Sequence, residues 1–272
     1  MAEEGVREFA SAVHRHPGLV AERFARYSWA ASLVTGKDVL DAGCGIGWGT
    51  AQLAERARKA VGVDISLPAI GEARHTYGDR MAFRREDLRE LPFADGEFDV
   101  VVCFETVERV EEPNIALDEM RRVLKSDGLL LISAANRDAY PPGNPFHLHE
   151  FSAVEVRNAL IARFSKVAVH RQHTYFASLL ASEETVELDD PSRRVEAEVT
   201  KMTGDRRDDA LYAVAAATDG ELPPAPARIV FGHGVDHEEQ RRLTAMWQER
   251  ALRAEIEADA IRTELEFVRR DQ

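Results

Sequence analysis

Cysteine is scarce in this sequence, with two in 272 residues, Cys44 and Cys103. Proteins of a reducing compartment rarely carry structural disulfides, so we expect both thiols to be small buried side chains. Long apolar runs are missing too, because none approaches the roughly 18 residues of a membrane-spanning helix. The N-terminal stretch Met1–Gly5 is acidic and lacks the basic start and apolar core of a signal peptide. These absences predict a cytoplasmic protein without a membrane span.

Positive charge is also in deficit. Lys and Arg number 35 against 48 Asp and Glu, which gives a formal net charge of −13. Sequence-independent binding to phosphate backbones needs clustered Lys and Arg, so nucleic acid is not expected as a partner. The hydrophobic share of 44% and the charged share of 31% are ordinary for a soluble protein. At this length we favour one α/β domain with an appended segment.

The stretch from Val39 to Thr50 is predicted to be a buried strand that breaks into a glycine loop and opens a helix. Such a loop lets backbone N–H groups approach an anionic or polar ligand group. A dinucleotide fold requires G-x-G-x-x-G, but Trp48 stands at the third glycine position, which disfavours a pyrophosphate ligand. The glycines that follow Asp41 are instead Gly43, Gly45 and Gly47.

This D-x-G-x-G-x-G pattern, with Asp64 at the end of the next predicted strand, resembles class I S-adenosylmethionine (SAM) dependent methyltransferases. The similarity runs through five motifs over residues 23–136, among them Glu105–Val110 and Arg122–Leu130. It implies SAM as the cofactor and an α/β, Rossmann-like fold with a seven-stranded, mostly parallel sheet and helices on both faces. In this family the last two strands form an antiparallel pair, with the final strand inserted beside its predecessor.

The periodicity of the chain places the elements of such a fold. Strands are expected at 37–40, 61–65, 81–88, 98–104, 129–136, 164–172 and 210–218. Helices are expected at 6–35, 50–57, 67–77, 115–124 and 153–162.

Domain limits follow from these elements. We expect an N-terminal helical cap over 1–36 and the SAM-dependent domain over 37–222, with an insertion at about 177–209. After a stiff proline-rich linker, residues 227–272 have an apolar stripe typical of a long, coiled-coil-like helix. We therefore predict a homodimer through this C-terminal helix.

The resemblance also implies cofactor contacts. Asp64 is expected to take two ribose hydroxyls, and a Tyr or Arg of residues 23–29 to meet the methionine carboxylate, unless that helix merely covers the sheet edge. Asp87 and the N–H of Leu88 would meet the adenine, because a carboxylate accepts from its amine and an amide donates to its ring. The predicted cofactor-binding residues are Tyr27, Asp41, Gly43, Gly45, Gly47, Asp64, Ile65, Asp87, Leu88 and Phe104.

The acceptor is expected beyond the carboxyl ends of the strands. Glu105 and Glu108 lie three apart on a predicted helical turn and can share a face, although Arg109 replaces the His common in the family. His147 and His149 lie in a turn-rich loop, and a His of near-neutral pKa can take the proton of an attacking hydroxyl. All four are candidate catalytic residues. Helix capping by a carboxylate and anchoring of the loop by the histidines stay open as alternatives.

A divalent cation such as Mg²⁺, held by His147, His149 and a carboxylate, is a weaker expectation, because hard cations prefer oxygen ligands. We assign no metal ligand.

The sequence thus predicts a SAM-dependent O-methyltransferase that acts on a hydroxyl of a small acceptor. The N-P-F-H-x-H-E-F-S run resembles bacterial methyltransferases of carbohydrate assembly, including sugar O-methyltransferases of methylmannose polysaccharide pathways, so a carbohydrate acceptor is favoured. A quinone, phenolic or other small metabolite is the alternative acceptor. Two rival functions are a non-catalytic SAM-binding scaffold and a nicotinamide-dependent oxidoreductase.

Overall fold

The computed structural model describes residues 17–78, 81–140, 147–173 and 210–225. The chain divides into two units, one from Glu22 to Phe231 and one that combines residues 1–21 with 232–272. The architecture below is that of the first unit. None of the described helices has the length and apolar character needed to cross a membrane.

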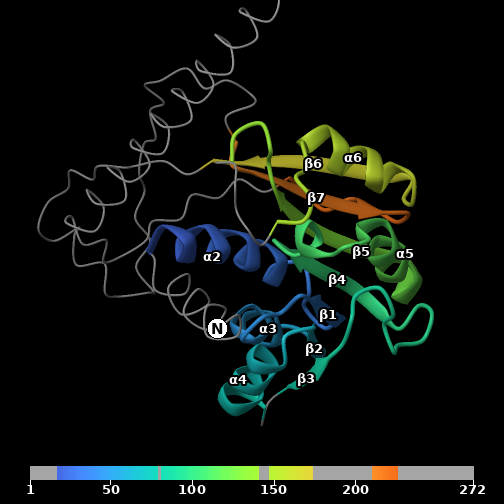
Figure 1. Cartoon of the computed structure of the whole chain (residues 1–272). Coiled ribbons are helices and arrows are strands. Elements are labelled where there is room, and N and C mark those ends of the chain that lie inside the picture. The colour runs from blue at the N-terminus through green and yellow to red at the C-terminus, as the bar shows by residue number, and fades with distance from the viewer. Residues whose placement is uncertain (1–16, 79–80, 141–146, 174–209, 226–272) are drawn as a thin grey trace, which may run out of the picture. The chain divides into compact units, whose positions relative to one another are not determined.

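A seven-stranded sheet forms the centre of this unit (Figure 1), in the order β3-β2-β1-β4-β5-β7-β6. The neighbours from β3 to β5 pair in parallel, whereas β7 runs antiparallel to both β5 and β6. The strands are β1 (Asp38–Ala42), β2 (Lys59–Asp64), β3 (Ala82–Arg85), β4 (Phe98–Phe104), β5 (Leu124–Ala135), β6 (Lys166–Gln172) and β7 (Tyr212–Thr218). The predicted Rossmann-like sheet, with its last strand inserted beside the one before, is confirmed.

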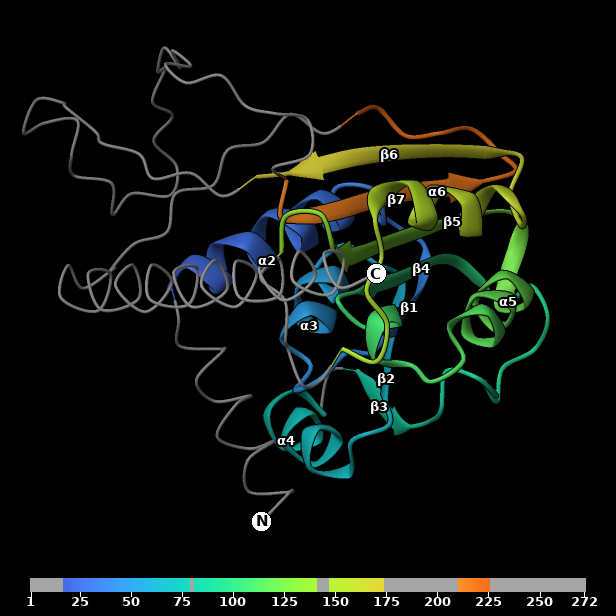
Figure 2. The same ribbon diagram turned by 45° about the horizontal axis from the view of Figure 1, so that its top comes forward.

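Helices cover both faces of the sheet, as predicted. They are α2 (Pro17–Ala31), α3 (Trp48–Ala54), α4 (Leu67–Tyr77), α5 (Pro113–Val123) and α6 (Ala153–Ile161), with a 3₁₀ turn, η1 (Val107–Arg109). Figures 1 and 2 show α2, α3 and α4 on one side of the sheet and α5 and α6 on the other.

Strand β4 is apolar from Val100 to Phe104 because this part is buried on both faces. Val101 and Cys103 pack into the core under α5 and α6, and Val100 and Val102 pack into the core under α2 and α3. Both free cysteines of the chain, Cys44 and Cys103, are buried, as expected.

Local capping explains where two helices begin. The Ser66 side chain accepts a hydrogen bond from the backbone N–H of Ala69 at the start of α4. Ser152 and Glu155 form a reciprocal capping box at the start of α6. Both helices match their predicted positions within a residue.

Several element boundaries differ from the sequence prediction, among them the following three. The strand predicted at 81–88 ends at Arg85, because the N–H of Glu86 still bonds to Asp64 but the chain then turns, with Glu90 donating to Asp87. The strand predicted at 129–136 instead starts at Leu124, directly after α5, and so includes residues 125–128. The helix predicted at 50–57 starts at Trp48 and ends at Ala54.

Several predictions fall outside the described residues. They are the part of the N-terminal cap before residue 17, the insertion at 177–209, and the long helix of 227–272 with the homodimer that rests on it.

Candidate cofactor and acceptor site

The glycine loop leaves β1 and enters α3 with three left-handed residues, Gly43, Gly45 and Gly47, at φ values of 87°, 54° and 83°. At two of these positions packing also requires glycine, because a side chain would clash. A Cβ on Gly43 would lie 2.2 Å from the Thr106 hydroxyl oxygen, and a Cβ on Gly47 would lie 2.7 Å from the Phe83 ring. Gly45 has no atom within 4 Å of such a Cβ. The loop is therefore fixed from behind and open at Gly45.

Asp64, at the end of β2, lies beside that opening. Its Oδ2 accepts a hydrogen bond from the Gly45 N–H at 2.9 Å, and its Oδ1 accepts one from the Ser66 N–H at 2.8 Å. A carboxylate has about four lone-pair sites, so two stay available for hydroxyl donors. The next residue, Ile65, is 60% exposed and offers an apolar surface. These residues suit the ribose and adenine of SAM.

Asp41, in contrast, is 1% exposed. Its Oδ1 accepts from the Tyr27 hydroxyl at 3.1 Å and its Oδ2 from the Thr50 hydroxyl at 2.7 Å. Burial raises the pKa of Asp41 to about 6, although these hydrogen bonds act against the shift. Asp41 therefore supports the glycine loop from within the protein.

The Tyr27 hydroxyl, expected at the methionine carboxylate, thus has Asp41 as its partner. The Tyr27 ring is buried and packs edge-on against Trp48 and Phe104, at centroid distances of 5.9 and 5.1 Å. Phe104, also expected at the cofactor, is buried in the same core cluster. The structure places both aromatic rings in the wall behind the loop.

Asp87 follows β3, as predicted, and β3 pairs with β2, the strand that ends in Asp64. Arg89 contacts both of its carboxylate oxygens, with its Nη2 at 2.8 Å from Oδ2 and its backbone N–H at 2.9 Å from Oδ1. This pairing lowers the pKa of Asp87. An adenine amine at Asp87 would therefore share the carboxylate with Arg89. The side chain of Leu88 is buried.

Glu105 follows β4 and is, among the described residues, the one non-glycine with positive φ, at 52°. Its N–H donates to the backbone oxygen and the hydroxyl of Ser133, both at 3.1 Å. Its carboxylate is ion-paired with Arg26 and lies 3.6 Å from the Nε of Arg23. Burial alone would raise the pKa of Glu105, but the charges of Arg26, Arg23 and Arg109 outweigh it and hold the pKa below its ordinary value.

Glu108 is 1% exposed and does not share an open face with Glu105. Its Oε1 accepts from the Ala135 N–H at 3.3 Å, while its Oε2 is buried without a hydrogen-bond partner among the described residues. Burial raises the pKa of Glu108 to about 7. Its carboxylate is therefore part of the protein interior.

The histidine loop is attached to η1 by its backbone, because the N–H groups of Leu148 and His149 both donate to the Glu108 carbonyl, at 2.9 and 3.0 Å. The Nε2 of His149 is 2.8 Å from the carbonyl oxygen of Glu111, which makes this nitrogen the donor. Loop anchoring, left open by the sequence, thus describes His149.

His147 is half-buried, and its ring lies 5.6 Å from that of Tyr140. Tyr140 in turn lies 5.7 Å from the ring of Tyr212 on β7. Burial, and then the positive charge of Arg109, lower the pKa of His147. A neutral imidazole of this kind can accept a proton at neutral pH. Tyr212, Tyr140 and His147 are called the ring row below.

No group of three or more His, Cys, Asp or Glu side chains within the described ranges is arranged to hold a metal ion. The weaker expectation of Mg²⁺ at His147 and His149 therefore gains no support.

The sequence offered Arg26 only as one of several possible contacts of the methionine carboxylate, and it assigned no role to Thr50, Arg89, Tyr140 and Tyr212. Arg89 follows Asp87 by two residues, so an ion pair of neighbours could have been anticipated there. Tyr212 has no comparable local signal, because its hydroxyl bonds to Glu22, 190 residues away.

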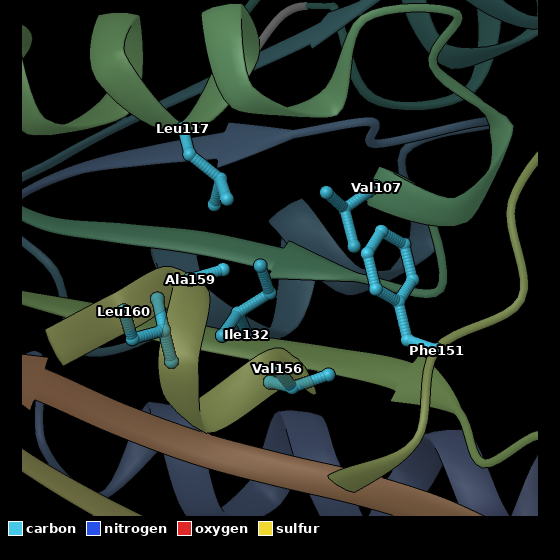
Figure 3. Close-up of a pocket in the computed structure, with 7 residues that line it drawn as sticks. All are labelled: Val107, Leu117, Ile132, Phe151, Val156, Ala159 and Leu160. Carbon is cyan, nitrogen blue, oxygen red and sulfur yellow. The ribbon is translucent and has the colours of Figure 1, made fainter. Parts of the chain in front are cut away.

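Figure 3 shows an apolar pocket next to α6, on the side of the sheet that α5 and α6 cover. It is lined by Val107, Leu117, Ile132, Phe151, Val156, Ala159 and Leu160. No polar side chain lines it, so nothing there would orient a ligand. We assign it to core packing.

Comparisons with known sequences agree with this geometry. Residues 40–132 match the family model described as a methyltransferase domain. A probable SAM-dependent methyltransferase of Mycolicibacterium smegmatis is 36% identical over 155 residues, which cover 53% of this chain and 60% of that protein. A ubiquinone biosynthesis O-methyltransferase of Dechloromonas aromatica is 33% identical over 119 residues, which cover 42% of this chain and 51% of that protein. The chain thus spans between half and about three fifths of the length of these relatives.

Among solved structures, a SAM-dependent methyltransferase of Thermotoga maritima, a possible histamine N-methyltransferase, has a TM-score of 0.54 at 20% identity. The alignment covers 80% of this chain and 97% of that one, and it supports the fold. The family match spans the glycine loop, Asp64 and the parallel strands that carry them. Residues 40–132 therefore resemble the methyltransferase domain family, on a fold that solved SAM-dependent methyltransferases share.

Proposed function

We propose that the chain transfers the methyl group of SAM to a hydroxyl of a small acceptor. The observation that carries this proposal is the pairing of Asp64 with Gly45, because a carboxylate with free lone pairs faces the open part of a left-handed glycine loop. When bound, SAM supplies a methyl group already activated by its sulfonium. The protein then has to align the acceptor and take its proton.

His147 is our candidate for the general base. A hydroxyl loses its proton as it attacks the methyl group, and a base in hydrogen-bond reach accelerates that step by about 10²–10⁴-fold. Glu105 is unsuited to this role because its ion pair with Arg26 lowers its pKa and makes it a weak base, and Glu108 because it is buried. His149 has its Nε2 bound to a carbonyl.

For the acceptor, we infer a ring-shaped molecule that lies against the ring row. The sequence resemblance favours a sugar or oligosaccharide. The name of the Dechloromonas relative favours a phenolic quinone precursor. Both have a flat face that can pack on Tyr140 and His147, so the ring row accommodates either.

The test is methyl transfer from labelled SAM to a panel of oligosaccharides, phenols and lipids, with and without EDTA, because a divalent cation such as Mg²⁺ stays part of the hypothesis. We expect transfer to at least one hydroxylated ring compound. Binding of S-adenosylhomocysteine without transfer to any acceptor would favour the scaffold function. Saturable binding of NAD and none of S-adenosylhomocysteine would favour the oxidoreductase.

Two further parts of the proposal concern the whole protein. We propose a cytoplasmic location and a homodimer formed through residues 227–272. Sedimentation of the full chain and of a variant that ends at residue 226 tests the second, since the shorter chain should be monomeric.

A further inference from the structure

Arg26 is a buried guanidinium, 3% exposed, where helix α2 meets the ends of three strands. Its Nη1 donates to the side-chain oxygen of Gln172 on β6 at 2.7 Å, and its Nη2 is paired with Glu105 after β4. Its guanidinium carbon lies 4.5 Å from the centre of the Tyr212 ring on β7. One side chain of α2 thus contacts β6, β7 and the turn after β4.

Two further hydrogen bonds hold α2 against β6 and β7 close to Arg26. The Tyr212 hydroxyl donates to the Glu22 carboxylate at 2.9 Å, and the Gln172 amide donates to the Glu22 carbonyl at 3.0 Å. Glu22 lies one helical turn before Arg26. The guanidinium therefore has little freedom to leave Glu105.

Two costs to folding coincide at this ion pair. The Nε of Arg26 is buried and has no hydrogen-bond acceptor within the described residues. Glu105 adopts the left-handed conformation that side chains other than glycine rarely take. Unsatisfied donors and backbone strain are uncommon, and where they persist they tend to cluster at functional sites.

The ion pair lies between the two halves of the site. On the cofactor side, Thr106, the residue after Glu105, packs against Gly43 of the glycine loop. On the acceptor side, Arg26 stacks on Tyr212, the first member of the ring row that ends at His147. The turn that carries Glu105 therefore borders both, but the glycine loop keeps its own contacts with Phe83 and Asp64, so we expect a displacement of the turn to act mainly on the ring row.

We propose that Arg26 is a positioning residue: it fixes the carboxylate and the left-handed backbone of Glu105 between the glycine loop and the ring row. Glu105 then acts as a fixed anion rather than as a base. Its negative charge favours the protonated form of His147, as does the charge of Glu150. Burial of His147 and the positive charge of Arg109 favour the neutral form. The inference rests on the proposed function only for the role of His147 as base.

The charges around Glu105 come from several elements. Arg23 and Arg26 approach it from α2 and Arg109 from η1. Its charge also raises the pKa of Tyr140, after the larger effect of burial. Of the three arginines, Arg26 alone is both buried and paired with the carboxylate, so it is the one to change.

The experiment compares Arg26→Met, Arg26→Lys, Glu105→Gln and the control Arg58→Met. Arg58 forms an exposed ion pair with Asp38. Arg58→Met therefore removes one positive charge, as Arg26→Met does. For Arg26→Met we expect kcat to fall about 100-fold, as for a misplaced reacting group, with affinity for S-adenosylhomocysteine changed less than about threefold. Arg26→Lys should recover part of kcat, and Arg58→Met should behave as the wild type.

A second readout does not depend on turnover. Titration of labelled histidines by NMR should move the midpoint of His147 to lower pH in Glu105→Gln, because the charge of Glu105 favours the protonated form of His147. An unmoved His147, or equal losses of kcat and of cofactor affinity in Arg26→Met, would overturn the inference. If Arg26→Met does not fold, Arg26→Lys and Glu105→Gln decide by the same criteria. Failure of the wild type to bind S-adenosylhomocysteine would instead count against the proposed function.

Discussion

The hydroxyl of Tyr27 on α2 donates a hydrogen bond of 3.1 Å to Oδ1 of Asp41 at the end of β1. The other oxygen of the same carboxylate accepts from Thr50 in α3. Asp41 therefore joins the helix that covers the site, the strand before the glycine loop and the helix after it. It does so from a buried position, which makes it a support of the loop.

The variant Tyr27→Phe tests this assignment. It removes one hydrogen bond to a buried carboxylate, so we expect the free energy of unfolding to fall by about 2 kcal/mol. The affinity for S-adenosylhomocysteine should fall less than about tenfold, since the loop keeps its other contacts. Urea denaturation and calorimetry measure the two. Unchanged stability with a large loss of affinity would return Tyr27 to direct contact with the ligand.

Asp64→Asn gives the opposite pattern. The amide keeps the shape of the side chain but loses the negative charge and one of the two oxygens that can accept hydrogen bonds from the ribose hydroxyls and from the Gly45 N–H. We expect affinity for S-adenosylhomocysteine to fall about 100-fold, equivalent to about 3 kcal/mol, with a smaller change in stability. Asp38→Asn is the matched control. Asp38 starts β1, which runs parallel to β2, so it lies at the opposite end of these strands from Asp64. Similar affinities of the two variants would contradict the ribose role of Asp64.

Local patterns were sufficient to predict most of the fold. The helix Leu67–Tyr77 was predicted with its exact limits, because Ser66 caps it and the chain turns at Gly78. The acids at the ends of β1 and β2 and just after β3 were located by the strand-then-acid pattern, because an acid that ends an apolar run marks the carboxyl end of a parallel strand. The antiparallel last pair, with the final strand inserted beside its predecessor, came from the family resemblance.

Contacts between distant residues could not be predicted in this way. Glu105 and Arg26 are 79 residues apart, and no local pattern relates them. The sequence therefore left Glu105 as a candidate base, whereas its ion pair with Arg26 supports our proposal that it acts as a fixed anion. Likewise, Asp41 was grouped with Asp64 as a ligand residue, because spacing does not reveal which of two strand-end acids is buried under a helix.

The pH dependence of stability is expected to depend on Glu108. Burial raises its pKa in the folded state to about 7 from 4.5, so the folded protein binds a proton that the unfolded chain releases. Stability from this group is complete below pH 4.5 and is lost as the pH rises through about 7. Glu108→Gln cannot ionise and should not lose it.

Denaturation of the wild type and of Glu108→Gln at pH 5 to 8 tests this expectation. The advantage of the variant should grow by about 2 kcal/mol over that range. A constant difference between the two proteins would mean that Glu108 ionises in the folded state as it does in the unfolded chain.

The two histidines of the acceptor loop provide an internal comparison. In His147→Ala we expect kcat to fall about 100-fold or more, as for loss of a general base, with cofactor affinity retained. In His149→Ala the loop loses its bond to Glu111, so KM for the acceptor should rise while kcat stays within about tenfold. Because burial lowers the pKa of His147, the acid limb of kcat/KM in the wild type should lie below pH 6.5. Equal effects of the two variants, or an acid limb that persists in His147→Ala, would assign the proton transfer to another group and leave both histidines as anchors of the loop.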